Sequence, residues 1–312
     1  MARPLALILI ALCLAVASSR AAPAHAATPP PEAGTQQQVN GTGTKPRAYR
    51  FGVITLNHPL VIYQQYQPFL DFLAERQPWR FELVLEHRYS TIVDRLEAGT
   101  LDIALLAGRT FLQAQGRTPL IPLCAVLGRD GTPTTRSLIV AREDRQDIRS
   151  PDDLKGKRFA FGSPDSTASY LAPLDHLTEH GITLEDFATY ANLTTHDAVA
   201  RAVLRGEYDA GALGEPMAVR YLGVGLKVVD ATQPFPGFII VARADVPEEV
   251  RNALRDALLG IDPDAPDVAR LSEGWNEVLR HGFGTVDASV YEMFRTMERR
   301  VGLSPDTQEA QP

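Results

Sequence analysis

Cysteine is nearly absent from this sequence of 312 residues, which contains only two. Cys13 lies in the apolar N-terminal segment, and Cys124 lies in the apolar run LIPLCAVLG. If the N-terminal segment is removed, a single cysteine remains, so no internal disulfide can form. Stability must then come from apolar cores, and we expect Cys124 to be a small buried residue in one of them.

Basic residues are outnumbered by acidic ones. The chain has 31 Lys and Arg against 38 Asp and Glu, which gives a formal net charge of -7, and no basic stripe interrupts this balance. This argues against a nucleic-acid partner. With 45% apolar and 22% charged residues, the composition is that of a globular protein, and the length suffices for two lobes.

The N-terminus lacks an apolar run long enough to span a bilayer, which takes about 20 residues. An apolar segment at residues 5–17 follows a single basic residue, and the triplet Ala-His-Ala at residues 24–26 supplies a cleavage site. This pattern predicts a signal peptide over residues 1–26 and a periplasmic mature protein. The alternatives are a retained membrane anchor and a lipid attached to Cys13.

Two further segments lack large apolar residues. Residues 27–48 are rich in Pro, Gly, Thr and Gln, and residues 305–312 are equally polar. Neither can bury enough surface to fold. We predict a flexible linker at residues 27–48 and a disordered tail at residues 305–312.

The rest of the chain alternates strand and helix patterns in two sets. The first set has strands at 49–56, 81–87 and 101–108, with helices at 63–76 and 91–99. The second set has strands at 157–163, 187–193, 208–214 and 226–231, with helices at 167–181, 196–207 and 215–223. Such repeats predict parallel sheets with helices on both faces.

Two extended segments connect the sets: residues 136–144 lead out of the first, and residues 235–245 return to it. Helices at 247–259 and 286–299 remain to pack on the first lobe. We therefore predict an α/β fold of two domains joined by two hinge strands, with a ligand in the cleft at the carboxyl ends of the strands. The predicted boundaries are 49–136 plus 236–304 for lobe 1 and 137–235 for lobe 2.

Three hydroxyl groups crowd one predicted helix start. In the stretch FGSPDSTASYLAP, Ser166, Thr167 and Ser169 directly follow a predicted strand. Capping a helix requires only one hydroxyl. The others, together with free N–H groups and the positive end of the helix dipole, favour an anion-binding turn.

Three segments resemble, in order and spacing, the periplasmic binding proteins for phosphate, phosphite and phosphonate that serve ABC transporters. They are YSTIVDRLEAGTLDIALLAG (89–108), SPDDLKGKRFAFGSPDSTASYLAP (150–173) and THDAVARAVLRGEYDAGAL (195–213). The resemblance spans residues 51–242. It implies the type II periplasmic binding protein fold, a clamp of two lobes that closes on a small anion.

The resemblance also implies ligand contacts. The turn at residues 166–169 corresponds to the turn that holds the phosphonate oxygens in the family. Tyr89 and His196, each at a predicted helix start, would complete this group of contacts. Glu215 would hold an amine in a ligand that carries one.

The chain departs from the family pattern at three places. Thr135 stands where a tyrosine precedes the first hinge strand, Ala168 and Ser169 alter the turn, and Arg109 follows a strand where the family has Pro or Asn. Arg109 would offer N–H donors to a second oxyanion. The predicted ligand-binding residues are Tyr89, Arg109, Thr135, Ser166, Thr167, Ser169, His196 and Glu215.

Each candidate has an ordinary structural alternative: capping for the hydroxyls, core packing for Tyr89, a solvated loop for Arg109 and a surface position for His196. The acid at residue 215 would also suit the first turn of any helix. The ligand therefore stays open at this stage between phosphonate, phosphite, phosphate and similar small oxyanions.

The predicted function is a periplasmic substrate-binding protein that passes its anion to an ABC permease in the inner membrane, as a monomer without a cofactor. The alternative is a periplasmic ligand-sensing subunit for a membrane receptor or histidine kinase. An enzyme is disfavoured because no G-x-S-x-G motif accompanies Ser166 and His196. We treat the histidines as scattered and predict no metal site.

Overall fold

The computed structural model describes residues 48–54 and 59–303. All of them belong to one compact unit, Thr44–Pro312. Within these described ranges, no helix combines the length and apolar character needed to cross a membrane. The predicted signal peptide (1–26), all but the last residue of the predicted linker (27–48) and the predicted tail (305–312) lie outside the described residues.

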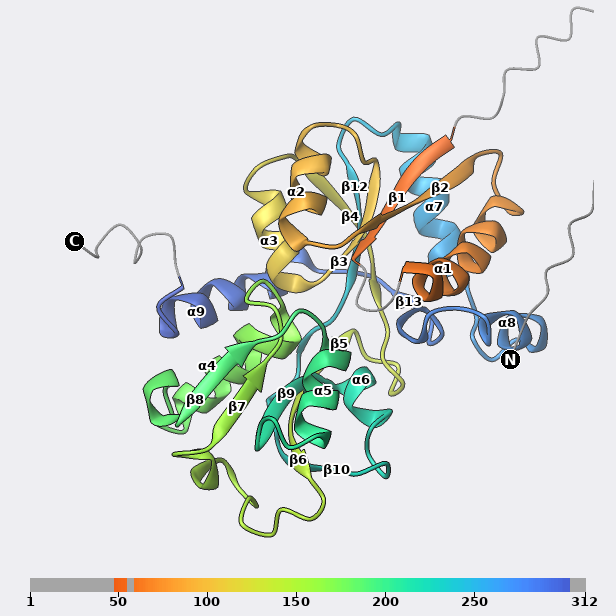
Figure 1. The fold of residues 1–312 in the computed structure, drawn as a ribbon. Helices are drawn as coiled ribbons and strands as arrows, with labels where there is room; N and C mark the ends of the chain where they lie inside the picture. The colour runs from red at the N-terminus through yellow and green to blue at the C-terminus, as the bar shows by residue number, and fades with distance from the viewer. Residues whose placement is uncertain (1–47, 55–58, 304–312) are drawn as a thin grey trace, which may run out of the picture. The chain divides into compact units, whose positions relative to one another are not determined.

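The first sheet has six strands in the order β13-β4-β12-β3-β1-β2 (Figure 1). Strand β1 runs parallel to β2 and β3, whereas β12 runs antiparallel to β3 and β4. The prediction of a parallel sheet is therefore wrong for the β13-β4-β12 part of this sheet, because the chain returns through the interior strand β12 in the opposite direction. The strands are β1 (Ala48–Ile54), β2 (Arg80–Glu86), β3 (Ile103–Leu106), β4 (Leu120–Val126), β12 (Ile239–Arg243) and β13 (Phe283–Gly284).

Helices cover both faces of this sheet. On one face, α1 (Pro59–Ala74) packs against β2 and α7 (Glu248–Leu259) against β4, with Phe69 and Leu254 in the shared core. On the other face lie α2 (Tyr89–Glu97) and α3 (Gly108–Gln115). Cys124 is free and fully buried in the first of these cores, which confirms its prediction as a small buried residue.

The second sheet has five strands in the order β10-β6-β9-β7-β8. Strand β7 runs parallel to β8 and β9, whereas β6 is antiparallel to β9 and β10. Helix α4 covers one face, and α5 and α6 cover the other. The elements are β6 (Ser137–Arg142), β7 (Arg158–Phe161), β8 (Thr189–Asn192), β9 (Ala210–Gly214), β10 (Leu226–Ala231), α4 (Ala172–Glu179), α5 (His196–Leu204) and α6 (Glu215–Val219).

A two-stranded antiparallel ladder joins the two sheets. It pairs β5 (Thr134–Thr135) with β11 (Phe235–Pro236), and these strands lead directly into β6 and β12. The predicted α/β fold of two lobes with two hinge strands is thus confirmed. The residues at which each lobe begins and ends stay a prediction.

Strand β4 and helix α3 are among the elements that were missed in the sequence. Strand β4 contains Pro122, which lies where its register with β12 shifts, a position at which a strand tolerates proline. Helix α3 begins after Ala107, which offers no side-chain cap. The remaining short elements are η1 (Pro151–Leu154), η2 (Thr167–Leu171), η3 (Leu184–Asp186), α8 (Pro266–Ser272), η4 (Glu277–Leu279), η5 (Ala288–Glu292) and α9 (Met293–Arg300).

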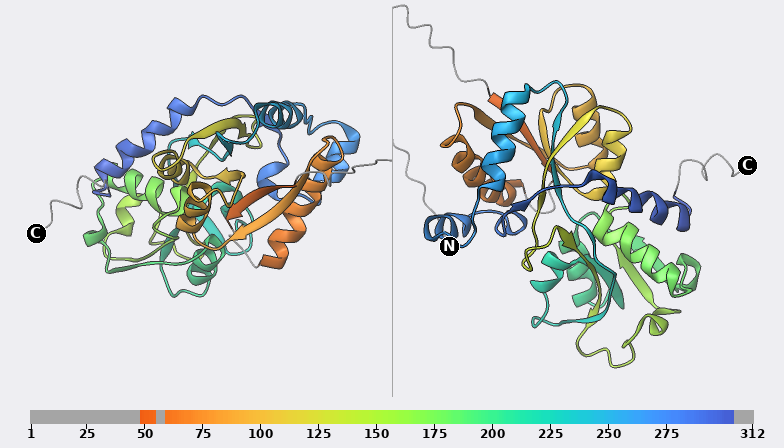
Figure 2. Two further views of the ribbon diagram at one scale, coloured as in Figure 1. Left: turned by 90° about the horizontal axis from the view of Figure 1, so that it is seen from above. Right: turned by 180° about the vertical axis from the view of Figure 1, so that it is seen from behind.

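Helix α9 contacts both lobes rather than the first alone. Its Phe294 is buried in the core formed by α2 and α3. Its Arg300 binds Asp175 of α4 at 3.1 Å (Nη1 to Oδ2) and also pairs with Glu179. Figure 2 shows α9, in dark blue, beside the green α4. The C-terminal helix therefore links the lobes as a third connection.

Candidate functional site

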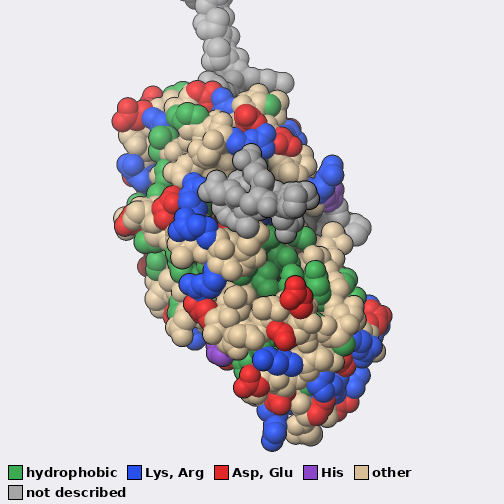
Figure 3. Space-filling view, turned by 90° about the vertical axis from the view of Figure 1, so that its left-hand side faces the viewer, with side chains coloured by type: hydrophobic (Ala, Val, Ile, Leu, Met, Phe, Trp, Pro, Cys, Tyr) green, Lys and Arg blue, Asp and Glu red, His purple; other side chains and the backbone are tan. Residues whose placement is uncertain are grey.

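A cavity of about 550 Å³ lies next to the hinge ladder, where elements of both lobes contribute to its wall. The starts of α2, η2, α5 and α6 face it, together with both hinge strands. Figure 3 shows hydrophobic side chains gathered in a hollow on this side of the molecule. The carboxyl ends of strands and the positive ends of helices thus meet at one place, as expected for a ligand site.

Two hydroxyls of the turn before α4 line this cavity. Ser166 caps η2, since its Oγ accepts a hydrogen bond from the N–H of Ser169 at 3.2 Å. The Oγ1 of Thr167 accepts a hydrogen bond from the N–H of Arg109 at 3.0 Å. Because each of these backbone bonds uses the oxygen as an acceptor, neither of them occupies the hydroxyl proton.

Tyr89 adds a hydroxyl from the first lobe. It is the first residue of α2, lines the cavity and is only 8% exposed. Burial raises the pKa of Tyr89 to about 12, although a hydrogen bond with Ser166 opposes the rise. The phenol therefore stays protonated at neutral pH and can act as a donor.

His196 is the first residue of α5 and also lines the cavity. Its Nδ1 accepts a hydrogen bond from the N–H of Gly214 at 3.1 Å. A neutral ring bonded in this way carries its proton on Nε2, which is then a donor. Burial lowers the pKa of His196 to about 4, so the ring is neutral at pH 7. We call Tyr89, Ser166, Thr167 and His196 the oxyanion corner.

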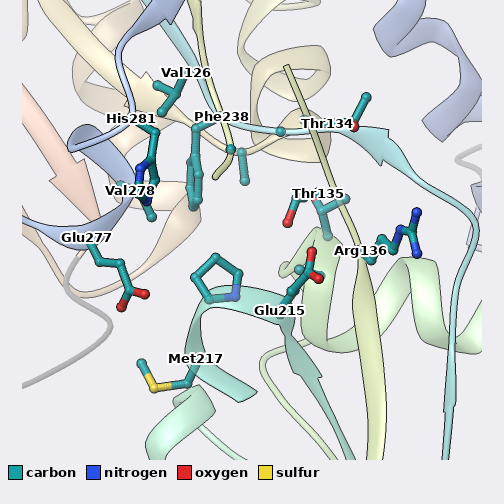
Figure 4. Close-up of a pocket in the computed structure, with 18 of the residues that line it drawn as sticks. Val126, Thr134, Thr135, Arg136, Glu215, Met217, Phe238, Glu277, Val278 and His281 are labelled. Carbon is teal, nitrogen blue, oxygen red and sulfur yellow. The ribbon is translucent and has the colours of Figure 1, made fainter. Parts of the chain in front are cut away.

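Thr135 and Glu215 also line the cavity. Glu215 begins α6, and its N–H donates to the carbonyl of Arg136 at 2.9 Å. Figure 4 shows the Glu215 carboxylate directed toward Thr135. Among residues 48–54 and 59–303, no hydrogen bond or ion pair engages this carboxylate, so it is available to a positive group in the cavity.

Arg109 and Ser169 do not belong to the described lining of the cavity. The Nε of Arg109 binds Glu298 Oε1 of α9 at 2.6 Å, and its Nη1 donates to the carbonyl of Pro164. Ser169 is fully buried against Gly162, and its hydroxyl has no partner within the described part of the chain. The sequence could not reveal the distant partner of Arg109, because that partner lies 189 residues away.

Sequence reasoning missed an apolar part of the cavity lining. We call its members, Val126, Met217, Phe238 and Val278, the apolar wall. Figure 4 shows Phe238 and Val278 beside His281. An ion pair from Arg220, the C-cap residue of α6, to Glu277 of η4, 3.1 Å between Nε and Oε2, links the lobes beside this wall. The only signal in the sequence was Phe238, which lies in the returning hinge segment.

Sequence reasoning also overlooked a spacing of two histidines outside the cavity. His176 and His180 form an H-x-x-x-H pattern over the last turn and C-cap of α4, and the fold brings Asp230 of β10 next to them. The prediction of no metal site treated these histidines as scattered. The i, i+4 spacing was the signal that would have found them.

Two α/β lobes, two hinge strands and a cavity at the starts of several helices define a type II periplasmic binding protein. Residues 51–291 match the family described as "ABC transporter, phosphonate, periplasmic substrate-binding protein". The chain belongs to this family.

Solved structures share the fold. PhnD1 from Prochlorococcus marinus, in complex with methylphosphonate, superposes with a TM-score of 0.73 at 21% identity, over 83% of this chain and 100% of that one. A binding protein component of a phosphonate ABC transporter from Pseudomonas aeruginosa gives a TM-score of 0.72 at 20% identity, over 86% of this chain and 91% of that one.

Two curated relatives match parts of the sequence. The phosphate-import protein PhnD of Mycolicibacterium smegmatis is 28% identical over 47% of this chain and 48% of its own length. The probable ABC transporter phosphite binding protein PhnD1 of Prochlorococcus marinus is 25% identical over 55% of this chain and 60% of its own length. The matched part thus spans about half the length of these relatives.

Proposed function

We propose that this protein is the periplasmic substrate-binding protein of an ABC importer and that it holds a phosphorus oxyanion in the cavity beside the hinge. The observation that carries the proposal is the oxyanion corner, where Tyr89 of the first lobe meets Ser166, Thr167 and His196 of the second. These groups are neutral donors. A hydrogen bond from a neutral donor to a charged oxygen is stronger than a hydrogen bond between two neutral groups.

The apolar wall favours an organic phosphonate over inorganic phosphate. Phosphate has only five heavy atoms and no carbon, whereas the cavity measures about 550 Å³ and one part of its lining is Val126, Phe238 and Val278. A phosphonate carries oxygens at one end and carbon at the other, so it complements both parts. Glu215 would bind an amine on that substituent, and Thr135 lies beside it.

Capture and delivery require no chemical reaction. Binding of the anion between the lobes would favour the closed form that a permease recognises. A nucleophilic role for Ser166 is further disfavoured by His196, because a triad histidine donates from Nδ1 to a carboxylate. Here Nδ1 instead accepts from the backbone of Gly214.

The proposal places the protein in the periplasm, exported through the signal peptide at residues 1–26 and acting as a monomer with an inner-membrane permease. The family assignment supports this location. A sensing role would require a receptor instead of a permease. Loss of phosphonate uptake in cells that lack this protein would distinguish transport from sensing.

Isothermal titration tests the binding step. The purified protein is titrated with phosphate, phosphite, methylphosphonate, 2-aminoethylphosphonate, sulfate and taurine. We expect at least one phosphorus oxyanion to bind with a stoichiometry of one, and a phosphonate to bind more tightly than phosphate. Tightest binding of sulfate or taurine, or no binding at all, would contradict the proposal.

A further inference from the structure

Three metal-ligating side chains meet on the second lobe, on the face that α4 covers. His176 comes from α4, His180 is the C-cap residue directly after it, and Asp230 comes from β10. One ligand atom from each lies within 4.8 Å of the other two. The two imidazole rings project from one side of the helix, with centroids 4.4 Å apart.

A β-bulge presents the carboxylate to the helix. The pairing of β10 with β6 shifts register between Val228 and Asp230. A bulge inserts one residue and re-aims the side chains that follow it. Val229 accordingly packs against the core under α4, and the next residue, Asp230, places its Oδ2 2.7 Å from Nε2 of His176.

His180 is oriented in the way that metal-binding histidines usually are. Its Nδ1 lies 2.8 Å from the carbonyl of His176 and donates to it. This bond leaves the lone pair of Nε2 free, because the neutral ring has only one proton. Metal-ligating histidines commonly donate the other ring N–H to a backbone carbonyl or a carboxylate.

We propose that His176, His180 and Asp230 bind one Zn²⁺. Two imidazole nitrogens and one carboxylate oxygen form a zinc ligand set with bonds of about 2.0–2.2 Å, and water completes the tetrahedron. His180 is exposed and the Asp230 side chain is 30% exposed, so the cation has a path from solvent. When the cation binds Nε2 of His176 it displaces the hydrogen bond to Asp230, and the neutral ring then carries its single proton on Nδ1.

The site is separate from the cavity beside the hinge. None of its three residues belongs to the described lining of that cavity. The nearest charged groups on α4, Asp175 and Glu179, are paired with Arg300 of α9. The zinc would therefore tie the C-terminal part of α4 to the edge strand β10 without contacting the anion. This inference stands independently of the proposed function.

Zinc binding is measured directly on protein that carries no affinity tag and has been stripped with chelator. After dialysis against zinc, elemental analysis should find one zinc per chain, and titration with ZnCl₂ should show one saturable site. At a hundredfold excess over Kd, the melting temperature should rise by roughly 5–10 °C if only the folded state binds. Substoichiometric zinc without a shift in melting temperature would overturn the proposal.

Variants separate a zinc site from a plain hydrogen-bonded pair. His180→Ala and Asp230→Asn should each weaken zinc binding at least about tenfold, since losing even an outer partner of a ligand costs that much. His87→Ala, which removes an exposed histidine elsewhere, is the matched control and should bind zinc like the parent. Equal zinc affinity in the parent and the three variants would overturn the proposal. Titration of each variant with methylphosphonate is the folding control, and an unchanged affinity shows that the cavity is intact.

Discussion

The oxyanion corner and the apolar wall face the same cavity but are built differently. In the corner, Ser166, Thr167 and His196 each accept a hydrogen bond from a backbone N–H, so their directions are fixed. The wall consists of side chains such as Met217 and Val278, which contribute only apolar surface. The comparison indicates a site that fixes the oxygens of its ligand strictly and tolerates variation in the substituent.

Removing the hydroxyls of the corner should have the largest effect. Each hydrogen bond to a charged oxygen contributes about 1.5–3 kcal/mol. Ser166→Ala combined with Thr167→Ala should therefore weaken phosphonate binding at least about a hundredfold in isothermal titration. Ser169→Ala is the matched control within the same turn and should leave the affinity unchanged, because its hydroxyl does not reach the cavity. If the double variant binds the phosphonate with less than a threefold loss of affinity, the oxyanion corner does not contact the ligand.

The neutral state of His196 should make stability depend on pH. Its folded pKa of about 4 lies below the ordinary value, so the unfolded chain binds the extra proton between pH 6.5 and 4. The free energy of unfolding should therefore be highest above pH 6.5 and should fall by about 3 kcal/mol as the pH is lowered from 6.5 to 4. Urea unfolding at pH 7 and pH 4 measures this difference.

A variant assigns the pH dependence to its source. His196→Gln should reduce the loss of stability between pH 6.5 and 4. The control is His281→Gln, which removes a second histidine, beside the apolar wall. Burial, and then the charge of Arg129, lower the pKa of His281, but its ring is more accessible than that of His196. We expect a smaller change from this control. Equal pH profiles for the parent and His196→Gln would show that the corner is not held neutral by burial.

Glu215 should matter only for ligands that carry an amine. Its carboxylate faces the cavity without a partner in the described ranges, so it can pair with an ammonium group. Glu215→Gln should weaken binding of 2-aminoethylphosphonate about tenfold, consistent with the loss of one charged hydrogen bond. Methylphosphonate serves as the control ligand and should bind the variant as it binds the parent. Equal losses for both ligands would rule out the amine role.

The smallest effect should come from the apolar wall. Each buried methylene contributes about 0.8 kcal/mol, so Met217→Ala should cost about 1 kcal/mol with a bulky ligand that covers this side chain. Titration should show phenylphosphonate binding weakened about fivefold and methylphosphonate binding unchanged. Identical losses for the two ligands would mean that the wall does not contact the substituent.

Local patterns in the sequence predicted much of the fold and part of the site. The apolar run of β7 and the helical spacing of α5 were visible directly, and they placed Ser166 after a strand and His196 at a helix start. Strand β4 was missed because Pro122 interrupts it. Contacts between residues far apart in the sequence could not be predicted. Arg109 forms an ion pair with Glu298 of α9, and Val126, Met217 and Val278 come together only in the folded chain.

A crystal structure of the complex with methylphosphonate tests the central claim most directly. We predict phosphonate oxygens within about 3.2 Å of Ser166 Oγ, Thr167 Oγ1 and His196 Nε2, with the methyl group toward the apolar wall. A phosphonate held instead by Arg129 or Arg220, with these three groups unengaged, would contradict the account.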